Sequence, residues 1–373
     1  MPSGSKYRVA IVGAGAIAAA HAGAVRALGD RAEVVAVADL DGARAAAFAA
    51  EHGVPAVFTD LATLLADVHP DLVTVCTPPG AHREAVLASL AAGAWVWCEK
   101  PPVLSLAEYD ELAAAESADD QAGPYVGYVF QHRFGSAANT LRQQVAEGTL
   151  GRPHVAICHT LWYRDHDYYA VPWRGKFETE GGGPAMGHGI HQMDLMLSLL
   201  GDWHEIRSLM GTLDRDVQTE DVSVAAVSFE SGALASVVNS VLSPRQESYL
   251  RFDFTDATVE VSHLYGYDNS HWTWTPRDGV DGAAWAPPTD EASSHTAQLK
   301  SYLDAMDAGS RPPASGHDGR RSLELVTGLY QSAITGQPVR REDLRPGNPF
   351  YTQLDGGGQY RPARPGTTPE VAR

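Results

Sequence analysis

The stretch Tyr7–Ala18, YRVAIVGAGAIA, decides the fold of the N-terminal part of the chain. An apolar run enters a glycine-rich turn, and an alanine-rich segment of helical character follows it. The turn has the pattern G-x-G-x-x-A. In this pattern the first glycine permits a tight turn, the second lets a pyrophosphate approach backbone N–H groups, and the small third residue lets helix and strand pack closely. The predicted contacts of a dinucleotide are Gly13, Gly15, Ala16, Ile17 and Ala18.

The next apolar run supports this prediction, because the glycine pattern alone also arises by chance in alanine-rich stretches. That run ends at Asp39, about 20 residues after the turn, where a carboxylate binds the adenosine ribose diol. An acidic side chain there repels a 2′-phosphate, so the sequence predicts NAD rather than NADP, although Arg44 leaves NADP open. Asp39 could instead be the N-cap of the following helix, a position that Asp41 could also fill.

Strand-like and helix-like segments alternate from Tyr7 to about residue 130. The strand-like runs EVVAVADLD, DLVTVCTPP and WVWCEKPP are almost continuously apolar, which is typical of parallel strands covered on both faces. We therefore predict a Rossmann domain with a doubly wound parallel sheet over residues 1–130.

After about Gly151 the pattern changes to strand-like runs joined by short turns, which indicates a largely antiparallel sheet with hairpins. One helix is predicted from about Gly187 to Leu200, and two more follow the last strand. The fold class is thus α/β plus α+β. The second domain, residues 131–341, is an open mixed sheet with helices on one face, and its late helices could pack back on the first domain. A Pro- and Gly-rich arm or disordered tail is predicted over residues 342–373.

Composition excludes several classes of partner. The 373 residues carry 28 Lys and Arg against 46 Asp and Glu, a net charge of −18, which argues against nucleic acid and anionic membranes. No run approaches the ~18–20 apolar residues that span a bilayer, and the apolar N-terminal segment lacks the features of a signal peptide. A cytoplasmic protein is expected. The three cysteines show no metal-binding spacing, and Cys76 and Cys98, each in an apolar strand-like run, are interpreted as reduced, buried thiols.

Glu99 and Lys100 follow the apolar run WVWC, at the carboxyl end of a predicted strand. Ligands of open α/β sheets bind at this end of the strands. Pro101 restricts Lys100 to extended backbone, which fixes where the ammonium group points. The alternative is that the two charges form a surface ion pair.

The stretch GGGPAMGHGIHQMD, residues 181–194, places five glycines, two histidines and an aspartate before an apolar helical run. The histidines could be metal ligands, proton-transfer groups or helix-packing residues. His188, His191 and Asp194 would share about one helix face, but their spacing matches no recognised zinc motif, so no metal is predicted. An imidazole titrates close to neutral pH and suits transfer of a hydroxyl proton.

The run WYRDHDYYAVPWRG, residues 162–175, combines aromatic and charged side chains in a loop-like segment. Aromatic faces stack on the C–H faces of a polyhydroxylated ring, and charged groups bind its hydroxyls. The segment could equally be a surface loop or a subunit contact. Candidate substrate contacts here and elsewhere are Arg133, Trp162, Arg164, Tyr168, His188 and Asp194.

Three stretches together carry a resemblance: GAGAIA, TPPGAHREAVLASLAAGAWVWCEKPP and GGG…GIHQMD. They resemble the Gfo/Idh/MocA oxidoreductases, the family of glucose–fructose oxidoreductase and inositol dehydrogenase. The resemblance extends from about Tyr7 to Val339. It implies a Rossmann domain followed by an open, mixed sheet domain that often mediates dimers or tetramers.

The resemblance also implies roles for individual residues. Lys100 would bind both the reacting substrate oxygen and the nicotinamide ribose, its bond to Pro101 would be cis, and His191 would transfer the proton. The family pattern D-x-G-x-H-x-x-D is matched at its last three positions, but Gly187 replaces the first aspartate, which often supports the histidine. Residues expected beside the cofactor are Thr77, Pro78, His82, Glu99, Lys100, Trp173 and Arg174.

The predicted function is an NAD-dependent dehydrogenase or ketoreductase for a secondary carbinol of a sugar, sugar derivative or cyclitol. Lys100 would polarise the oxygen and His191 would act as acid and base. Two alternatives remain: a glycosidase that uses transient oxidation by NAD, and a non-catalytic sensor or co-repressor on the same fold. A homodimer or homotetramer through the C-terminal sheet is expected.

Overall fold

The computed structural model describes residues 6–116 and 123–361. The chain divides into two compact units, each described here by itself. Unit 1 comprises Met1–Val103, Glu108–Phe130 and His295–Arg320, and unit 2 comprises Leu104–Ala107, Gln131–Ser294 and Arg321–Arg373.

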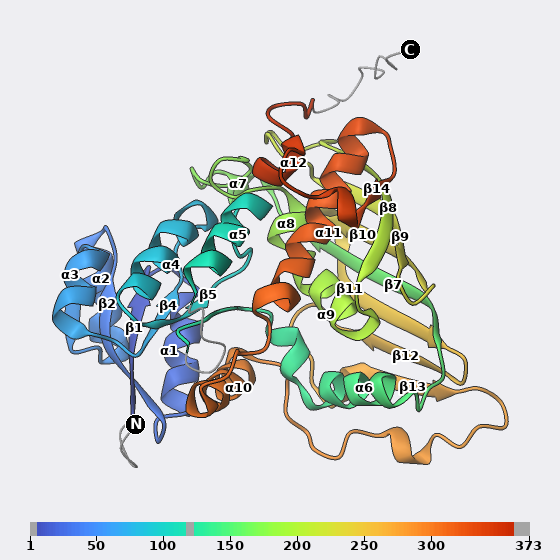
Figure 1. Cartoon of the computed structure of the whole chain (residues 1–373), viewed down its shortest axis with the longest axis horizontal. Helices are drawn as coiled ribbons and strands as arrows, with labels where there is room; N and C mark the ends of the chain where they lie inside the picture. The colour runs from blue at the N-terminus through green and yellow to red at the C-terminus, as the bar shows by residue number, and fades with distance from the viewer. Residues whose placement is uncertain (1–5, 117–122, 362–373) are drawn as a thin grey trace. The chain divides into compact units, whose positions relative to one another are not determined.

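The described part of unit 1 contains a six-stranded parallel sheet with the order β3-β2-β1-β4-β5-β6 (Figure 1). From β1 the chain adds β2 and β3 on one side of the sheet, and it then adds β4, β5 and β6 on the other side. Ligands of such sheets bind at the switch point, which lies between β1 and β4. The predicted doubly wound parallel sheet is confirmed. The strands are β1 (Tyr7–Val12), β2 (Ala32–Ala38), β3 (Ala56–Phe58), β4 (Leu72–Val75), β5 (Trp95–Cys98) and β6 (Val126–Tyr128).

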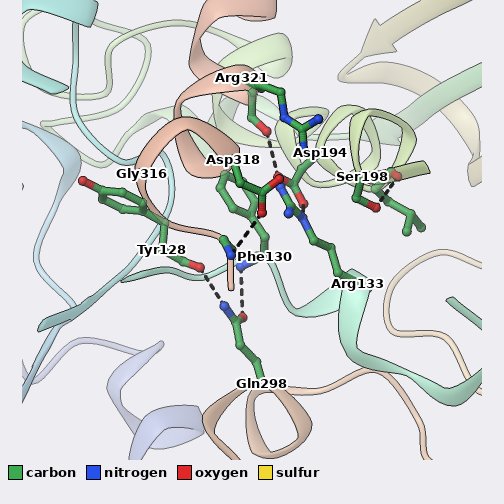
Figure 2. A network of polar contacts seen from close by, with 12 residues as sticks. Tyr128, Phe130, Arg133, Asp194, Ser198, Gln298, Gly316, Asp318 and Arg321 are labelled. Atoms are coloured by element: carbon green, nitrogen blue, oxygen red, sulfur yellow. Dashed lines mark hydrogen bonds and ion pairs between the residues drawn. The ribbon is translucent and has the colours of Figure 1, made fainter. Parts of the chain in front are cut away.

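Apolar side chains from the strands and helices of unit 1 form its core, and α1 packs against α10. Figure 2 shows how α10 is tied to the sheet: the Gln298 side chain donates to the Tyr128 carbonyl at 2.7 Å and accepts the Phe130 N–H at 3.0 Å. The helices are α1 (Ala18–Ala27), α2 (Gly42–His52), α3 (Leu61–Val68), α4 (His82–Ala91), most of α5 (Leu106–Ala115) and α10 (His295–Ala308).

The described part of unit 2 is built on an eight-stranded sheet with the order β13-β12-β11-β7-β10-β9-β8-β14 (Figure 1). Within this sheet β7 and β10 run parallel and the other neighbours run antiparallel, so the predicted mixed, largely antiparallel sheet is confirmed. The strands are β7 (Pro153–Tyr163), β8 (Trp203–Gly211), β9 (Val222–Phe229), β10 (Leu234–Ser240), β11 (Leu242–Phe254), β12 (Ala257–Ser262), β13 (Trp272–Pro276) and β14 (Val339–Arg340).

Helix α9 packs against β7 and β11, and α6 packs against α9. Every residue of α9 except Ser198 is buried, which accounts for its apolar composition. The helices of unit 2 are α6 (Ser136–Glu147), α7 (His166–Tyr169), α8 (Pro184–Gly187), α9 (Ile190–Leu200), most of α11 (Gly316–Thr335) and α12 (Pro349–Thr352).

The prediction of a single helix from Gly187 to Leu200 is wrong at the N-terminal end of that range. The structure has two helices, because α8 ends at Gly187 and α9 begins at Ile190. At the junction the Gly189 N–H reaches back to the Pro184 carbonyl at 2.7 Å, which closes a wider turn than an α-helix does. His188 therefore lies outside α9 and does not share a helix face with His191.

The predicted C-terminal arm or tail is folded onto unit 2 as far as it is described. It contains α12, the side chains of Phe350 and Leu354 are buried, and the Tyr360 hydroxyl lies 2.9 Å from that of Thr212. Disorder is therefore not found for residues 342–361, because apolar side chains anchor them. The rest of the predicted tail, residues 362–373, lies outside the described residues.

Two other expectations concern burial and membranes. Cys76 and Cys98 are free and buried, as predicted, and Cys158 is free and buried as well. Over residues 6–116 and 123–361, no helix combines the length and the apolar character needed to cross a bilayer.

Candidate active site

The glycine turn joins β1 to α1 beside the end of β4, at the switch point of the unit 1 sheet. Gly13 has a φ of +92°, and a Cβ there would lie 2.8 Å from the Cys76 carbonyl, so only glycine fits. In contrast, no atom lies within 4 Å of a Cβ built on Gly15. This open space lies beside the N-terminus of α1, where the sequence predicts the diphosphate of a dinucleotide.

Asp39 follows β2, and its carboxylate is held next to the glycine turn. It accepts hydrogen bonds from the N–H groups of Ala14 at 2.8 Å and Asp41 at 2.9 Å, and from the Arg44 guanidinium at 3.0 and 2.5 Å. Burial opposes the charge, but these hydrogen bonds outweigh it and lower the pKa of Asp39. Asp41 is the N-cap of α2, so Asp39 is not needed for that role.

Asp39→Ala is expected to move the cofactor preference from NAD toward NADP. The variant would lose the predicted acceptor for the ribose diol, and it would free Arg44 to pair with a 2′-phosphate. A charged hydrogen bond contributes about 1.5–3 kcal/mol, so kcat/KM for NAD should fall about tenfold or more. The ratio of kcat/KM for NADP to that for NAD measures the change.

Asp60→Ala is the matched control, because Asp60 is also an aspartate of unit 1 but serves as the N-cap of α3. It should lower the stability of the protein, because α3 loses its N-cap, without changing the cofactor ratio. An unchanged ratio in Asp39→Ala would remove the assigned role of Asp39.

Glu99 is the centre of a buried polar cluster at the end of β5. One carboxylate oxygen accepts hydrogen bonds from Nε2 of His21 at 3.0 Å and Nε2 of His295 at 3.3 Å, and the other accepts the Lys100 N–H at 3.1 Å. Burial opposes the charge of Glu99, but the two imidazoles more than compensate and hold its pKa well below the usual range. Glu99 thus fixes the backbone of Lys100. The Lys100–Pro101 bond is cis, as predicted.

His21 and His295 were not singled out from the sequence. The position of His21 in α1, just after the glycine turn, could have indicated that it lies near the predicted site. His295 gave no such indication, because it belongs to α10, almost two hundred residues after Glu99. The ligand atoms of His21, Glu99 and His295 lie within 4.8 Å of one another, a spacing that could also hold a metal ion. The two N–O distances are those of hydrogen bonds, which account for the arrangement without an ion.

His82, the first residue of α4, connects two segments that follow neighbouring strands. Its ring nitrogens lie 2.9 Å from the carbonyl oxygens of Pro101 and Thr77. The side chain is fully buried, and burial lowers the pKa of His82. The His82 ring therefore connects the segment of Thr77 and Pro78, which follows β4, to the cis peptide segment, which follows β5. Both segments lie at the carboxyl edge of the sheet.

In unit 2, the glycines of residues 181–194 permit close approach to neighbouring strands. A Cβ on Gly183 would lie 1.9 Å from the Glu220 carbonyl oxygen, and one on Gly189 would lie 1.8 Å from Oδ1 of Asn239. The Glu220 backbone excludes any side chain at position 183, and a side chain at position 189 would require the Asn239 side chain to move. Packing thus favours glycine at both positions.

Glu220 holds this turn through its side chain. Its carboxylate accepts the N–H groups of Gly183 and Ala185, both at 3.0 Å, and the Tyr330 hydroxyl. Burial raises the pKa of Glu220 to about 7. Sequence reasoning missed this residue, because its partners lie far from it along the chain.

His191 and Asp194 lie one turn apart in α9, and both are buried. Asp194 is ion-paired with Arg133, which donates from two guanidinium nitrogens, and it also accepts the Ser322 hydroxyl at 2.7 Å. Figure 2 shows the Arg133 guanidinium directed at Asp194. The structure thus brings two predicted substrate contacts together, and each neutralises the charge of the other.

Gly187, where the family pattern has aspartate, faces a carboxylate. The atom nearest to a Cβ built there is Oε1 of Glu180, at 3.7 Å. Glu180 is buried and accepts from Arg174 at 3.3 Å and from the Gly175 N–H at 2.5 Å. An aspartate at position 187 would bring a second carboxylate against Glu180, and the two like charges would repel.

The aromatic run forms a cluster in unit 2 together with His188. Trp162 lies in β7 rather than in a loop; it is buried, and its ring centroid is 5.2 Å from that of His188. The Tyr168 hydroxyl lies 3.3 Å from Nε2 of His188 and accepts from Arg174. Cation–π contacts in this cluster include those of Arg164 with Trp162 and Tyr168, and of Arg174 with Tyr168 and Trp173.

The predicted residues are thus grouped by unit. The glycine turn, Asp39 and Lys100 belong to unit 1, and the aromatic cluster and His191 belong to unit 2.

Comparison with known proteins identifies the family. Residues 7–125 match the model of the Gfo/Idh/MocA oxidoreductase family with its NAD-binding Rossmann fold, and residues 138–279 match a C-terminal domain of the same family. Together the two matches cover more than half of the chain.

Individual relatives agree along almost the whole length. D-glucoside 3-dehydrogenase of Escherichia coli (strain K12) is 30% identical over 361 residues, covering 90% of this chain and 97% of the relative. Myo-inositol 2-dehydrogenase of Thermotoga maritima is 27% identical over 350 residues, covering 90% and 99%. The crystal structure of the WlbA dehydrogenase from Bordetella pertussis, in complex with NADH and UDP-GlcNAcA, has a TM-score of 0.80 and 26% identity, covering 90% of this chain and 99% of that one. The chain therefore belongs to the Gfo/Idh/MocA oxidoreductase family, as its motifs predict, and is an NAD(P)-dependent oxidoreductase acting on CH–OH groups.

Proposed function

We propose that this protein is an NAD-dependent dehydrogenase or ketoreductase for a secondary carbinol of a sugar, sugar derivative or cyclitol. The observation that supports this substrate class is the cluster of Trp162, Arg164, Tyr168 and His188 in unit 2. It joins flat aromatic faces to charged hydrogen-bond donors, which suits a ring that carries many hydroxyls. The names of the relatives agree, since they include a D-glucoside and an inositol dehydrogenase.

Each proposed step is assigned to a residue of this chain. NAD, when bound, supplies the hydride acceptor. His191 takes the hydroxyl proton as the carbonyl forms, and it returns that proton in the reverse direction. The Lys100 ammonium stabilises the negative charge that develops on the reacting oxygen. Glu99, held by His21 and His295, keeps the Lys100 backbone in place.

The test is a panel of substrates with NAD, followed at the absorbance of NADH. The panel contains methyl glucosides, free aldoses and myo-inositol, and 1,5-anhydro-D-fructose is tested with NADH, since a relative from Ensifer adhaerens is a 1,5-anhydro-D-fructose reductase. We expect NADH to form in stoichiometric excess over enzyme with at least one alcohol. Glycoside cleavage without net NADH would instead support the glycosidase alternative. Sugar binding without any redox turnover would support the sensor.

We also propose that one face of the unit 2 sheet joins copies of the chain into a dimer or tetramer. Val155 and Leu234 are paired on β7 and β10, Leu209 and Val224 are paired on β8 and β9, and all four are exposed. The strand register places them on one face of the sheet. An apolar sheet face of this kind is typical of a protein interface.

The expected mass in solution is therefore that of an oligomer, measured by light scattering. The double variant Leu209→Glu, Leu234→Glu should lower this mass, because charges on the face oppose its burial. Leu40→Glu is the control, since Leu40 is 92% exposed but belongs to unit 1. A monomeric wild-type protein would contradict the proposal.

A further inference from the structure

A second histidine lies against His191 within unit 2. His132 belongs to the 3₁₀ turn Gln131–Phe134, and its side chain is 1% exposed, while that of His191 is 2% exposed. The two ring centroids are 5.1 Å apart, and the ring planes are inclined by 33°. The predicted proton-transfer group is therefore one half of a buried histidine pair.

Two tyrosines from the segment after β12 pack around the histidine pair. The Tyr265 ring contacts both imidazoles, with centroid distances of 5.0 Å to His132 and 5.6 Å to His191. The Tyr267 ring lies 4.6 Å from that of His132. Both tyrosines are themselves held, because Gln131 donates to the Tyr265 hydroxyl and Gln192 donates to that of Tyr267 at 3.1 Å.

The elements that carry the two histidines are also joined to each other. The Arg133–Asp194 ion pair connects the turn after His132 to α9, one helical turn beyond His191. Gln192, next to His191, accepts the Thr160 hydroxyl of β7 at 3.0 Å. The separation of the two rings is therefore set by contacts on both sides of the pair.

Several of the groups near the pair are neutral or paired with an opposite charge. Arg133 and Asp194 neutralise each other, and burial raises the pKa of both Tyr267 and Cys158, so these remain uncharged near neutral pH. The buried residues of α6, α8 and β11, which also pack against α9, are not ionisable. The ionisable side chains in ring contact with the pair include Tyr265 and Tyr267. Those on or beside the elements that pack against α9 include Arg133, Asp194, Cys158, His188 and Glu180, which lies against Gly187 at the end of α8.

We propose that His132 is a positioning residue for His191, which fixes the orientation of its ring and keeps it neutral to lower pH. The inference rests on the proposed acid–base role of His191. Two imidazolium charges at this separation in a buried site repel, so the pair titrates as a coupled system and resists taking up a second proton. A neutral His191 is the form that accepts a proton from the substrate.

The proposed effect of His132 on the pKa of His191 is opposite to that of the aspartate which the family pattern places at position 187. A carboxylate beside a histidine stabilises the imidazolium and raises its pKa, whereas a second histidine lowers it. In this chain the aspartate is absent and the second imidazole is present. The chain would therefore keep its base available on the acid side of neutrality.

The test compares the titration of His191 in the wild-type protein and in His132→Phe, by NMR of ¹⁵N-labelled histidine in the full chain without ligand. Phenylalanine keeps a ring in place but cannot be protonated. We expect the pKa of His191 to rise by about half a pH unit or more in the variant. The acid limb of kcat/KM against pH, measured with the sugar that the panel identifies, should move in the same direction.

His132→Gln gives the same comparison if the phenylalanine variant does not fold. His154→Gln is the control, because His154 is an exposed histidine at the start of β7 and should leave the titration of His191 unchanged. An unchanged pKa of His191 in both His132 variants would overturn the inference. Full turnover in His191→Ala would instead refute the acid–base role of His191, and the NMR comparison would still decide whether the two rings are coupled.

Discussion

His191→Ala is expected to lower kcat by about 10²–10⁴-fold, the usual contribution of a general acid or base. The hydroxyl proton of the substrate would then have no positioned acceptor as the carbonyl forms. Affinity for NAD should hardly change, because the glycine turn and Asp39, which carry the cofactor assignments, belong to unit 1 and His191 belongs to unit 2. Steady-state turnover and NAD titration by calorimetry measure the two effects separately.

The pH profile adds a second readout for the same variant. Loss of a titrating base should remove the acid limb of kcat against pH, whereas loss of a packing residue would lower turnover equally at every pH. His159→Ala is the matched control, because His159 is half-buried on β7 and pairs its ring with Tyr249. Unchanged turnover in His191→Ala would demote His191 to a structural residue.

Lys100→Met should lower kcat/KM by about 10²–10³-fold, the range found when one preorganised donor to a developing oxyanion is removed. Methionine has a similar length but no charge, so the alkoxide would lose its positive partner. Lys100 is also expected to bind the nicotinamide ribose. KM for NAD should therefore rise as well, which separates this variant from His191→Ala.

Two further variants define the control for Lys100. Lys300→Met removes a lysine from an exposed position of α10 and should leave both constants unchanged. Lys100→Arg keeps the charge but changes its shape and reach, so activity should recover only in part. A Lys100→Met enzyme with wild-type kcat/KM would contradict the assigned role.

The parts of the site that depend on local chemistry were predictable from the sequence. The glycine turn, the acid after β2 and the charged pair after β5 each lie within a few residues of a strand end, and strand and turn preferences act over such distances. Asp41 illustrates this point: its place just before a helical run made it one of two candidate N-caps, and the structure shows that it is the N-cap of α2.

The error at residues 187–200 has a different cause. Apolar periodicity favoured one helix, but the chain turns at His188 and Gly189, where the backbone of Gly189 lies close to the Asn239 side chain of β10. The apolar periodicity of residues 187–200 does not indicate that Asn239 lies against this part of the chain. Contacts across the sheet override local helical preference at such points.

The sequence by itself determined the two fold classes, the dinucleotide turn and the family, because these depend on periodicity and short motifs. Only the tertiary structure decided which groups surround the residues of the candidate site. His295 reaches Glu99, Glu220 holds the turn at Gly183, and His132 packs on His191. These partners are distant along the chain, and their pairing follows from sheet order and packing, which bring separate segments to the same place.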